Sequence, residues 1–121
     1  MNFINYDNLL FSNLDNKETV LITAEKDTYV ESISICNKND KSNFILMSLR
    51  HVKSLNVPNP INTYRIRNLI IDKNTTKDLI QYLGRNIFLN NGDSLIVSSA
   101  GYTEIFDCVI DFYELNEIVN G

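Results

Sequence analysis

The sequence has little of the residues that usually carry catalysis or bind metals. Its 121 residues include no tryptophan, one histidine (His51), two cysteines, two prolines and four glycines. A single histidine cannot supply a histidine-based metal site, and no CxxC pair of the kind that binds zinc is present. The glycine-rich phosphate loop and the other short catalytic motifs are also missing. We therefore expect no enzyme, with no catalytic residues, no metal and no cofactor.

Positive charge is also scarce. Eleven Lys and Arg stand against fifteen Asp and Glu, which gives a formal net charge of −4. Nucleic acid is therefore not the expected partner, because phosphate binding depends on clustered basic side chains. No apolar run approaches the roughly 18 residues of a membrane span, and the N-terminal residues lack the basic and apolar regions of a signal peptide. We expect one globular domain that contacts no membrane.

Cys36 and Cys108 lie far apart in the sequence, each in a stretch of alternating apolar residues. Two cysteines in a chain long enough to form its own core do not indicate a disulfide framework. We expect both to be small buried residues with reduced thiols. His51 is expected to be a polar residue at the end of a strand.

Strand patterns dominate, and helical periodicity is poor. Asn-rich and Asp-rich turns separate short runs of β-branched and aromatic residues. Residues 75–83 are ambiguous: a strand is favoured, and the alternative is a short helix with Thr75 or Thr76 as its N-cap. The other predicted strands are Glu18–Ala24, Thr28–Asn37, Phe44–Val52, Thr63–Ile71, Asn86–Leu89, Ser94–Ser99 and Ile105–Leu115.

The connections between these strands suggest local pairing. The first three predicted strands are interpreted as an antiparallel meander. Lys53–Asn62 contains Pro58 and Pro60 and is expected to be a loop. Asn90–Asp93 contains Asn-Gly, which favours a type I′ hairpin turn.

The last predicted strand has the clearest alternation. Its inward residues are expected to be Phe106, Cys108, Ile110 and Phe112. Asp107 and Asp111 are then expected to face water. At about 3.3 Å per residue they lie about 13 Å apart, which is too far for a glycosidase carboxylate pair.

Six to eight short strands predict an all-β fold, either an antiparallel β-sandwich or a small jelly roll. The sandwich domain is expected to span residues 18–121, preceded by an N-terminal arm at residues 1–17. The arm either packs on its own sandwich or lies on a neighbouring subunit. Its large apolar residues, the candidate assembly contacts, are Phe3, Ile4, Tyr6, Leu9, Leu10 and Phe11.

Two arginines on a predicted strand form another candidate contact. Arg65 and Arg67 share one face of Thr63–Ile71 and could bind an acidic partner. The alternative is that they form the solvated face of an edge strand.

Two stretches resemble small β-sandwich virion structural proteins of tailed bacteriophages. The first is ETVLITAEKDTYVESISICNKND, in which an opening strand and a short turn lead to an apolar strand that ends at Asn37. The second is NIFLNNGDSLIVSSAGYTEIFDCVIDFYEL, in which Gly92-Asp93 opens a strand with small polar residues. With the intervening LIIDKNTTKDLI, the resemblance covers about residues 18–115. The chain departs from the usual Pro-Ala-Gly turn, which here reads Ala24-Glu25-Lys26-Asp27.

The resemblance implies a structural virion protein, placed at the capsid surface, the neck or the tail, that acts in a homo-oligomeric assembly. Its partners would be other virion proteins and copies of itself, and it would be assembled in the bacterial host cytoplasm. The alternative is a receptor- or carbohydrate-binding module at the tail tip. Exposed loop aromatics would favour that alternative, and the candidates are Tyr64 and Tyr102.

Overall fold

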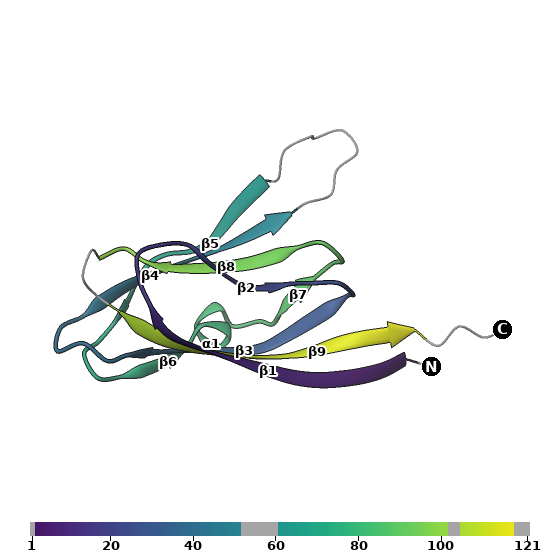
Figure 1. Cartoon of the computed structure of the whole chain (residues 1–121), viewed down its shortest axis with the longest axis horizontal. Coiled ribbons are helices and arrows are strands. Elements are labelled where there is room, and N and C mark those ends of the chain that lie inside the picture. Colours follow the sequence, from purple (N-terminus) through teal and green to yellow (C-terminus); the bar gives the residue numbers. More distant parts are fainter. Residues whose placement is uncertain (1, 52–60, 102–104, 118–121) are drawn as a thin grey trace.

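The fold consists of two antiparallel β-sheets that face each other as two layers (Figure 1). The computed structural model describes residues 2–51, 61–101 and 105–117. Sheet A has the strand order β1-β9-β3-β6, with β7 also paired to β3, and sheet B has the order β2-β8-β4-β5. The elements are β1 (Asn2–Leu14), β2 (Thr19–Thr23), β3 (Thr28–Asn37), β4 (Asn43–His51), β5 (Ile61–Ile71), β6 (Thr76–Asp78), α1 (Leu79–Leu83), β7 (Ile87–Leu89), β8 (Ser94–Ser99) and β9 (Phe106–Glu117). The predicted all-β sandwich is confirmed.

The strand pairing is that of a jelly roll. β1 pairs with β9, β2 with β8, β3 with β6 and β7, and β4 with β5. These nested pairs are those of one long hairpin rolled up into two sheets. β6 and β7 pair with opposite halves of β3 and together occupy one strand position, which α1 interrupts.

Two predicted local pairings are wrong. Residues 18–52 do not form a meander, because β2 and β4 belong to sheet B and β3 belongs to sheet A. Asn90–Asp93 does not close a hairpin, because β7 and β8 lie in different sheets. Gly92 has a φ of 97°, and no such positive angle occurs at Asn91, so the turn is not type I′.

Residues 75–83 combine both structures that the sequence left open. Thr76–Asp78 is a strand, so the favoured prediction is right there, but Leu79–Leu83 is a helix. The N-cap is Asp78, not Thr75 or Thr76: its carboxylate accepts a hydrogen bond from the Ile80 amide at 3.0 Å. The helix ends at Gly84, whose φ of 77° is the left-handed conformation that glycine adopts readily.

The core lies between the sheets and contains the predicted inward face of the last strand. Phe106, Cys108, Ile110 and Phe112 are all buried, at most 3% exposed, which confirms the alternation. Both cysteines are free. Only Cys108 is buried, whereas Cys36 lies half-buried between the inward-facing Ile35 and Asn37, so its predicted burial is wrong.

The N-terminal segment, which the sequence analysis does not count among the strands, forms strand β1 of sheet A. β1 pairs with β9 from Asn2↔Glu117 to Leu14↔Phe106. The apolar run Leu9, Leu10 and Phe11 interrupts the period-two pattern, so the sequence alone does not indicate this strand. The division into an arm at residues 1–17 and a domain at residues 18–121 stays a prediction.

Candidate functional site

The predicted assembly residues lie on β1, which forms one edge of sheet A (Figure 1). Tyr6, Leu9 and Leu10 are exposed, Leu10 to 69%. Phe11 is partly buried against the core. The side chains of Phe3 and Ile4 lie outside the described part of the structure. One long edge of β1 therefore faces away from β9 and carries apolar side chains at the surface.

β1 differs from the other edge strands in how that edge is protected. Short length, bulges, charged side chains and proline all discourage pairing at a sheet edge. β6 and β7 have three residues each, and β2 has five residues and a register shift. β5 has two register shifts and carries Arg65 and Arg67. β1 has 13 residues, no proline, and Asp7 as its only charged residue. Its one register shift lies at the far end, between Phe11 and Leu14.

The predicted arginine pair is only partly brought together. Both side chains are exposed, but one extra residue of β5 separates the pairs Met47↔Ile66 and Ser48↔Tyr64, and that residue is Arg65. A bulge changes the direction of the side chain that it inserts. Arg65 lines an open cleft of about 270 Å³.

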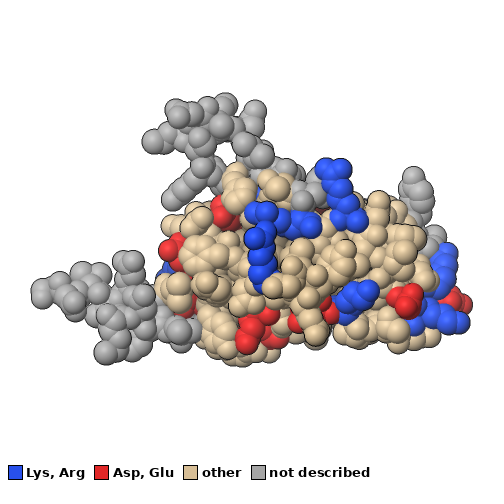
Figure 2. All heavy atoms as spheres, turned by 180° about the vertical axis from the view of Figure 1, so that it is seen from behind, with Lys and Arg blue, Asp and Glu red and all other residues tan. Residues whose placement is uncertain are grey.

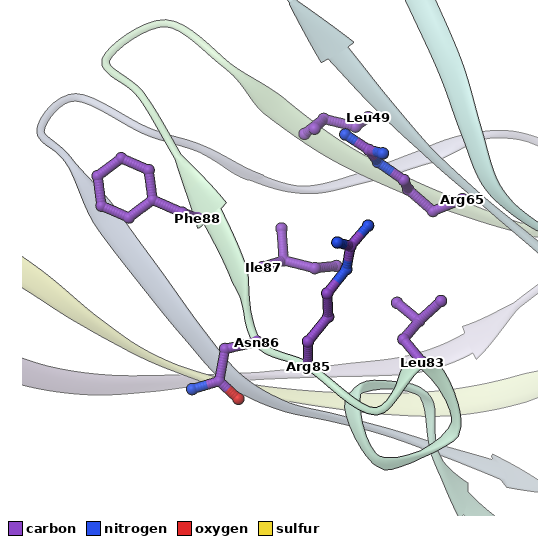
Figure 3. Close-up of a pocket in the computed structure, with 7 residues that line it drawn as sticks. All are labelled: Leu49, Arg65, Leu83, Arg85, Asn86, Ile87 and Phe88. Atoms are coloured by element: carbon purple, nitrogen blue, oxygen red, sulfur yellow. The ribbon is translucent and has the colours of Figure 1, made fainter.

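A second arginine, which sequence reasoning missed, lines the same cleft. Arg85 extends from the connection between α1 and β7 towards the strand that carries Arg65 (Figure 3). Neither arginine has an ion pair or a hydrogen bond within the described ranges 2–51, 61–101 and 105–117. The remaining lining residues, mainly apolar, are Leu49, Leu83, Asn86, Ile87 and Phe88. Two cations beside an apolar wall suit a carboxylate on an apolar stem.

Basic side chains gather on one face of the molecule. Figure 2 shows a group of Lys and Arg side chains near the middle of the face opposite to that of Figure 1, on a surface made largely of other residues. With a net charge of −4, the protein has more acidic than basic groups overall. The basic side chains gather on this face although acidic residues outnumber basic ones in the chain.

Sheet A also carries a row of aromatic side chains across four neighbouring strands. Tyr6 of β1 is in register with Tyr113 of β9, Tyr113 with Tyr29 of β3, and Tyr29 with Phe88 of β7. Tyr6, Tyr29 and Phe88 are 40–55% exposed. The rings form two contacting pairs: Tyr6 and Tyr113 have centroids 5.1 Å apart, and Tyr29 and Phe88 5.3 Å apart. We call these four residues the aromatic row.

A row of hydrogen-bonding side chains runs beside the aromatic row. Asn8 is in register with Asp111, and Asp111 with Ser32. Asp111 accepts hydrogen bonds from the hydroxyls of Tyr6 (2.9 Å) and Ser32 (2.7 Å). It is half-buried between β1 and β3, so the expectation that it simply faces water is incomplete. We call Asn8, Asp111 and Ser32 the polar row.

Two of the aromatic hydroxyls donate hydrogen bonds to carboxylates. The hydrogen bond from Tyr6 to Asp111, followed by desolvation, raises the pKa of Tyr6 above its usual value. The hydrogen bond from Tyr113 to Glu31 is the main cause of the raised pKa of Tyr113. Both tyrosines therefore remain neutral hydrogen-bond donors at physiological pH.

Two other polar residues considered in the sequence, Asp107 and His51, have structural partners. Asp107 forms an ion pair with Lys38 at 3.1 Å and accepts a hydrogen bond from the Asn13 amide, so it too is more than a solvated side chain. His51 ends β4, as predicted, and its Nδ1 lies 3.4 Å from the buried carboxylate of Asp93. That carboxylate also accepts a hydrogen bond from the Asn90 amide, which closes the turn before β8.

Among the described residues, no group of three or more His, Cys, Asp or Glu side chains is arranged to hold a metal ion. No helix in this part of the chain has the length and apolarity needed to cross a membrane. Tyr64, considered as a loop aromatic in the sequence, lies in β5 instead, and its side chain is outside the described part of the structure. Tyr102 also lies outside the described residues. The exposed aromatics of the aromatic row lie on strands instead.

No protein-family model matches the chain, and no curated protein matches it.

Proposed function

We propose that this protein is a structural component of a tailed-phage virion that associates with copies of itself and with other virion proteins. It would act at the capsid surface, the neck or the tail, and be assembled in the bacterial host cytoplasm. The observation that carries the association is the unprotected edge of β1, which is 13 residues long and has one charged residue. The virion assignment is supported by the sequence resemblance and by a jelly-roll strand order, which occurs in viral capsid domains among others.

A second copy of the chain is the simplest partner for β1. Two antiparallel β1 strands related by a two-fold axis would join two A sheets into one continuous sheet. Each copy would present the same surface, as a two-fold interface requires. Pairing would satisfy backbone groups on the free edge and cover Leu9 and Leu10.

The basic cleft provides a second contact of different chemistry. Arg65 and Arg85 can bind a carboxylate of a neighbouring protein, and an acidic chain offers such groups on each copy. This contact would weaken as the salt concentration rises, because the cleft is open to solvent. Association through β1 would be less sensitive to salt, since backbone hydrogen bonds and apolar contacts carry it.

The test of the association compares two matched lysine substitutions. Leu10→Lys places a charge on the exposed surface of β1, and Val20→Lys does the same on β2, one of the two edge strands of sheet B. Light scattering coupled to size exclusion should show an oligomer for the wild type and Val20→Lys, and a monomer for Leu10→Lys. A monomeric wild type at high micromolar concentration, or an unchanged oligomer for Leu10→Lys, would overturn the role of β1.

The virion assignment has its own test. Peptides of the chain should be detected by mass spectrometry in purified particles of the phage that encodes it, and portal, capsid or tail genes should lie beside its gene. Detection only in the infected-cell lysate, with the peptides absent from the particles, would contradict the assignment even if β1 mediates association.

A further inference from the structure

We propose that the aromatic row and the polar row together bind an extended neutral oligosaccharide, laid across sheet A at right angles to its strands. This is a binding activity beyond the proposed structural role. It rests on the side chains of the outer face of sheet A rather than on the edge of β1. The register of four strands, the ring contacts and the hydrogen bonds of Asp111 support it.

The aromatic row has the shape of a linear chain of rings. Its four members come from neighbouring strands in direct register, so the row crosses three strand spacings, or about 14 Å. A pyranose ring has an apolar C–H face that packs on an aromatic ring. A short run of sugar units can therefore lie along the row, with one contact at each ring pair.

The tilt of the rings indicates which form of sugar chain fits. The interplanar angle is 54° between Tyr6 and Tyr113, and 74° between Tyr29 and Phe88. The four rings do not form a single flat platform, such as the surface of a crystalline polysaccharide would need. A soluble chain whose successive rings are turned relative to each other matches this arrangement better.

The polar row lies where the hydroxyl groups of such a chain would be. Asp111 already accepts one hydrogen bond at each oxygen, from Tyr6 and from Ser32. A carboxylate has about four acceptor positions, so about two remain for ligand hydroxyls. Asn8 can donate and accept from the neighbouring strand position.

The charges of this surface favour a neutral ligand. The carboxylates of Asp111 and Glu31 flank the row, and both accept hydrogen bonds from its tyrosines. A uronic acid, a sialic acid or a phosphorylated sugar would bring negative charge against them. The same hydrogen bonds fix the Tyr6 and Tyr113 rings before binding, which reduces the entropy lost on association.

The experiment uses the full chain in affinity electrophoresis through gels that contain soluble polysaccharides. The neutral probes are glucans, mannans and galactans, and the anionic probes are polygalacturonate and hyaluronan. At least one neutral polysaccharide should retard the wild type, and the anionic probes should not. Tyr29→Ala should weaken binding at least about tenfold, because it removes one ring pair. Asp111→Asn should weaken binding less than Tyr29→Ala, since the amide oxygen still accepts.

The matched control is Tyr82→Ala, which removes a tyrosine of similar exposure to Tyr6 from α1, outside the row. It should leave retardation within about twofold of the wild type. Thermal unfolding of each variant checks that the fold persists. Three results would overturn the proposal: no retardation by any neutral probe, equal losses for Tyr29→Ala and Tyr82→Ala, or preferential binding of the anionic probes.

The oligomeric state of Tyr29→Ala separates this proposal from a protein contact on the same face. The variant should keep the size of the wild type in light scattering. If it dissociates the oligomer and the wild type binds no neutral probe, the aromatic row is a protein interface and the carbohydrate site is refuted. The β1 proposal is tested separately by Leu10→Lys.

Discussion

Ile110 shows how strongly one position on β9 depends on its inward orientation. It is fully buried and pairs with Leu9 on one side and Ile33 on the other. Ile110→Asp would bury an unpaired carboxylate, so we expect a loss of about 4 kcal/mol or more in the free energy of unfolding. Val109→Asp, one residue away and half-buried on the outer face, is the matched control and should cost much less. Urea unfolding measures both, and equal losses would contradict the assigned inward face.

Cys108 makes the free energy of unfolding depend on pH in the alkaline range. Burial raises the pKa of its thiol from 9.0 to about 12. The folded protein therefore holds the proton more tightly than the unfolded chain does. The thiol's contribution to the free energy of unfolding is fully present at pH values below its pKa in the unfolded chain. It is lost as the pH rises towards the pKa of the thiol in the folded protein. Between pH 8 and 11 the loss should be on the order of 2 kcal/mol.

The measurement for Cys108 is urea unfolding across that pH range, with Cys108→Val as the reference. The variant lacks the Cys108 thiol and keeps that of Cys36, so its free energy of unfolding should fall less steeply with pH than that of the wild type. The offset caused by repacking does not affect the comparison of slopes. Parallel pH profiles would show that Cys108 does not titrate differently in the folded and unfolded chains.

The inward residues of β9 could be predicted from the sequence because alternation is a local property. The period of two alone was enough to predict the inward residues Phe106, Cys108, Ile110 and Phe112. The aromatic row could not be predicted in this way. Tyr6 and Tyr113 lie at opposite ends of the chain, and their alignment with Tyr29 depends on two strand registers. Taken alone, Tyr6 and Tyr29 are ordinary exposed residues and Tyr113 is an ordinary half-buried one.

At the scale of elements, Asp78 joins a strand, a helix and the neighbouring strand. Its carboxylate accepts hydrogen bonds from the amide of Ile80 in α1 and from the amide of Ile33 in β3, at 3.0 and 3.1 Å. Asp78→Ala leaves both amides without this acceptor and should cost about 1–2 kcal/mol. Asp78→Asn keeps an acceptor oxygen and should recover most of the loss.

The Asp78 variants are compared by urea unfolding and by amide exchange. Exchange of the Ile33 and Ile80 amides should accelerate in Asp78→Ala and remain slow in Asp78→Asn. An equal loss of stability in the two variants would show that the charge of Asp78, rather than its role as an acceptor, stabilises this junction.

The partners of the strands were harder to predict than the strands themselves. Most strand runs were recognised from composition, but the meander and the hairpin were wrong because neighbouring strands in the chain lie in opposite sheets. Which sheet a strand joins depends on pairing between strands far apart in the sequence, such as β1 with β9. Arg85 was missed for a related reason. It follows α1, and only the path of that connection brings it to Arg65.

At the scale of the whole molecule, β1 belongs to the sandwich as well as to the proposed interface. Phe11 and Leu14 pack against the core, and the amide of Ser99 donates to the carbonyl of Asp15 at 2.9 Å. Deleting residues 1–17 would remove these contacts and leave β9 as a new sheet edge. We expect the truncated chain to lose several kcal/mol of stability and to aggregate.

Circular dichroism and urea unfolding of the truncated chain test this expectation. The point variant Leu10→Lys provides the comparison, since it should abolish association and retain the fold. A truncated chain with the unfolding midpoint of the wild type would mean that residues 1–17 form a separable arm, as the sequence suggested.

Association through β1 also predicts that stability depends on protein concentration. An oligomer that forms only from folded chains is stabilised by mass action. A tenfold rise in protein concentration above the dissociation constant therefore raises the free energy of unfolding by up to about 1.4 kcal/mol. For a domain of this size the melting temperature should then rise by several degrees. Differential scanning calorimetry at several concentrations should show this rise for the wild type and for Val20→Lys. Leu10→Lys should melt at the same temperature throughout, because its charge on the β1 edge prevents the pairing. A wild type whose melting temperature is independent of concentration would contradict self-association through this edge.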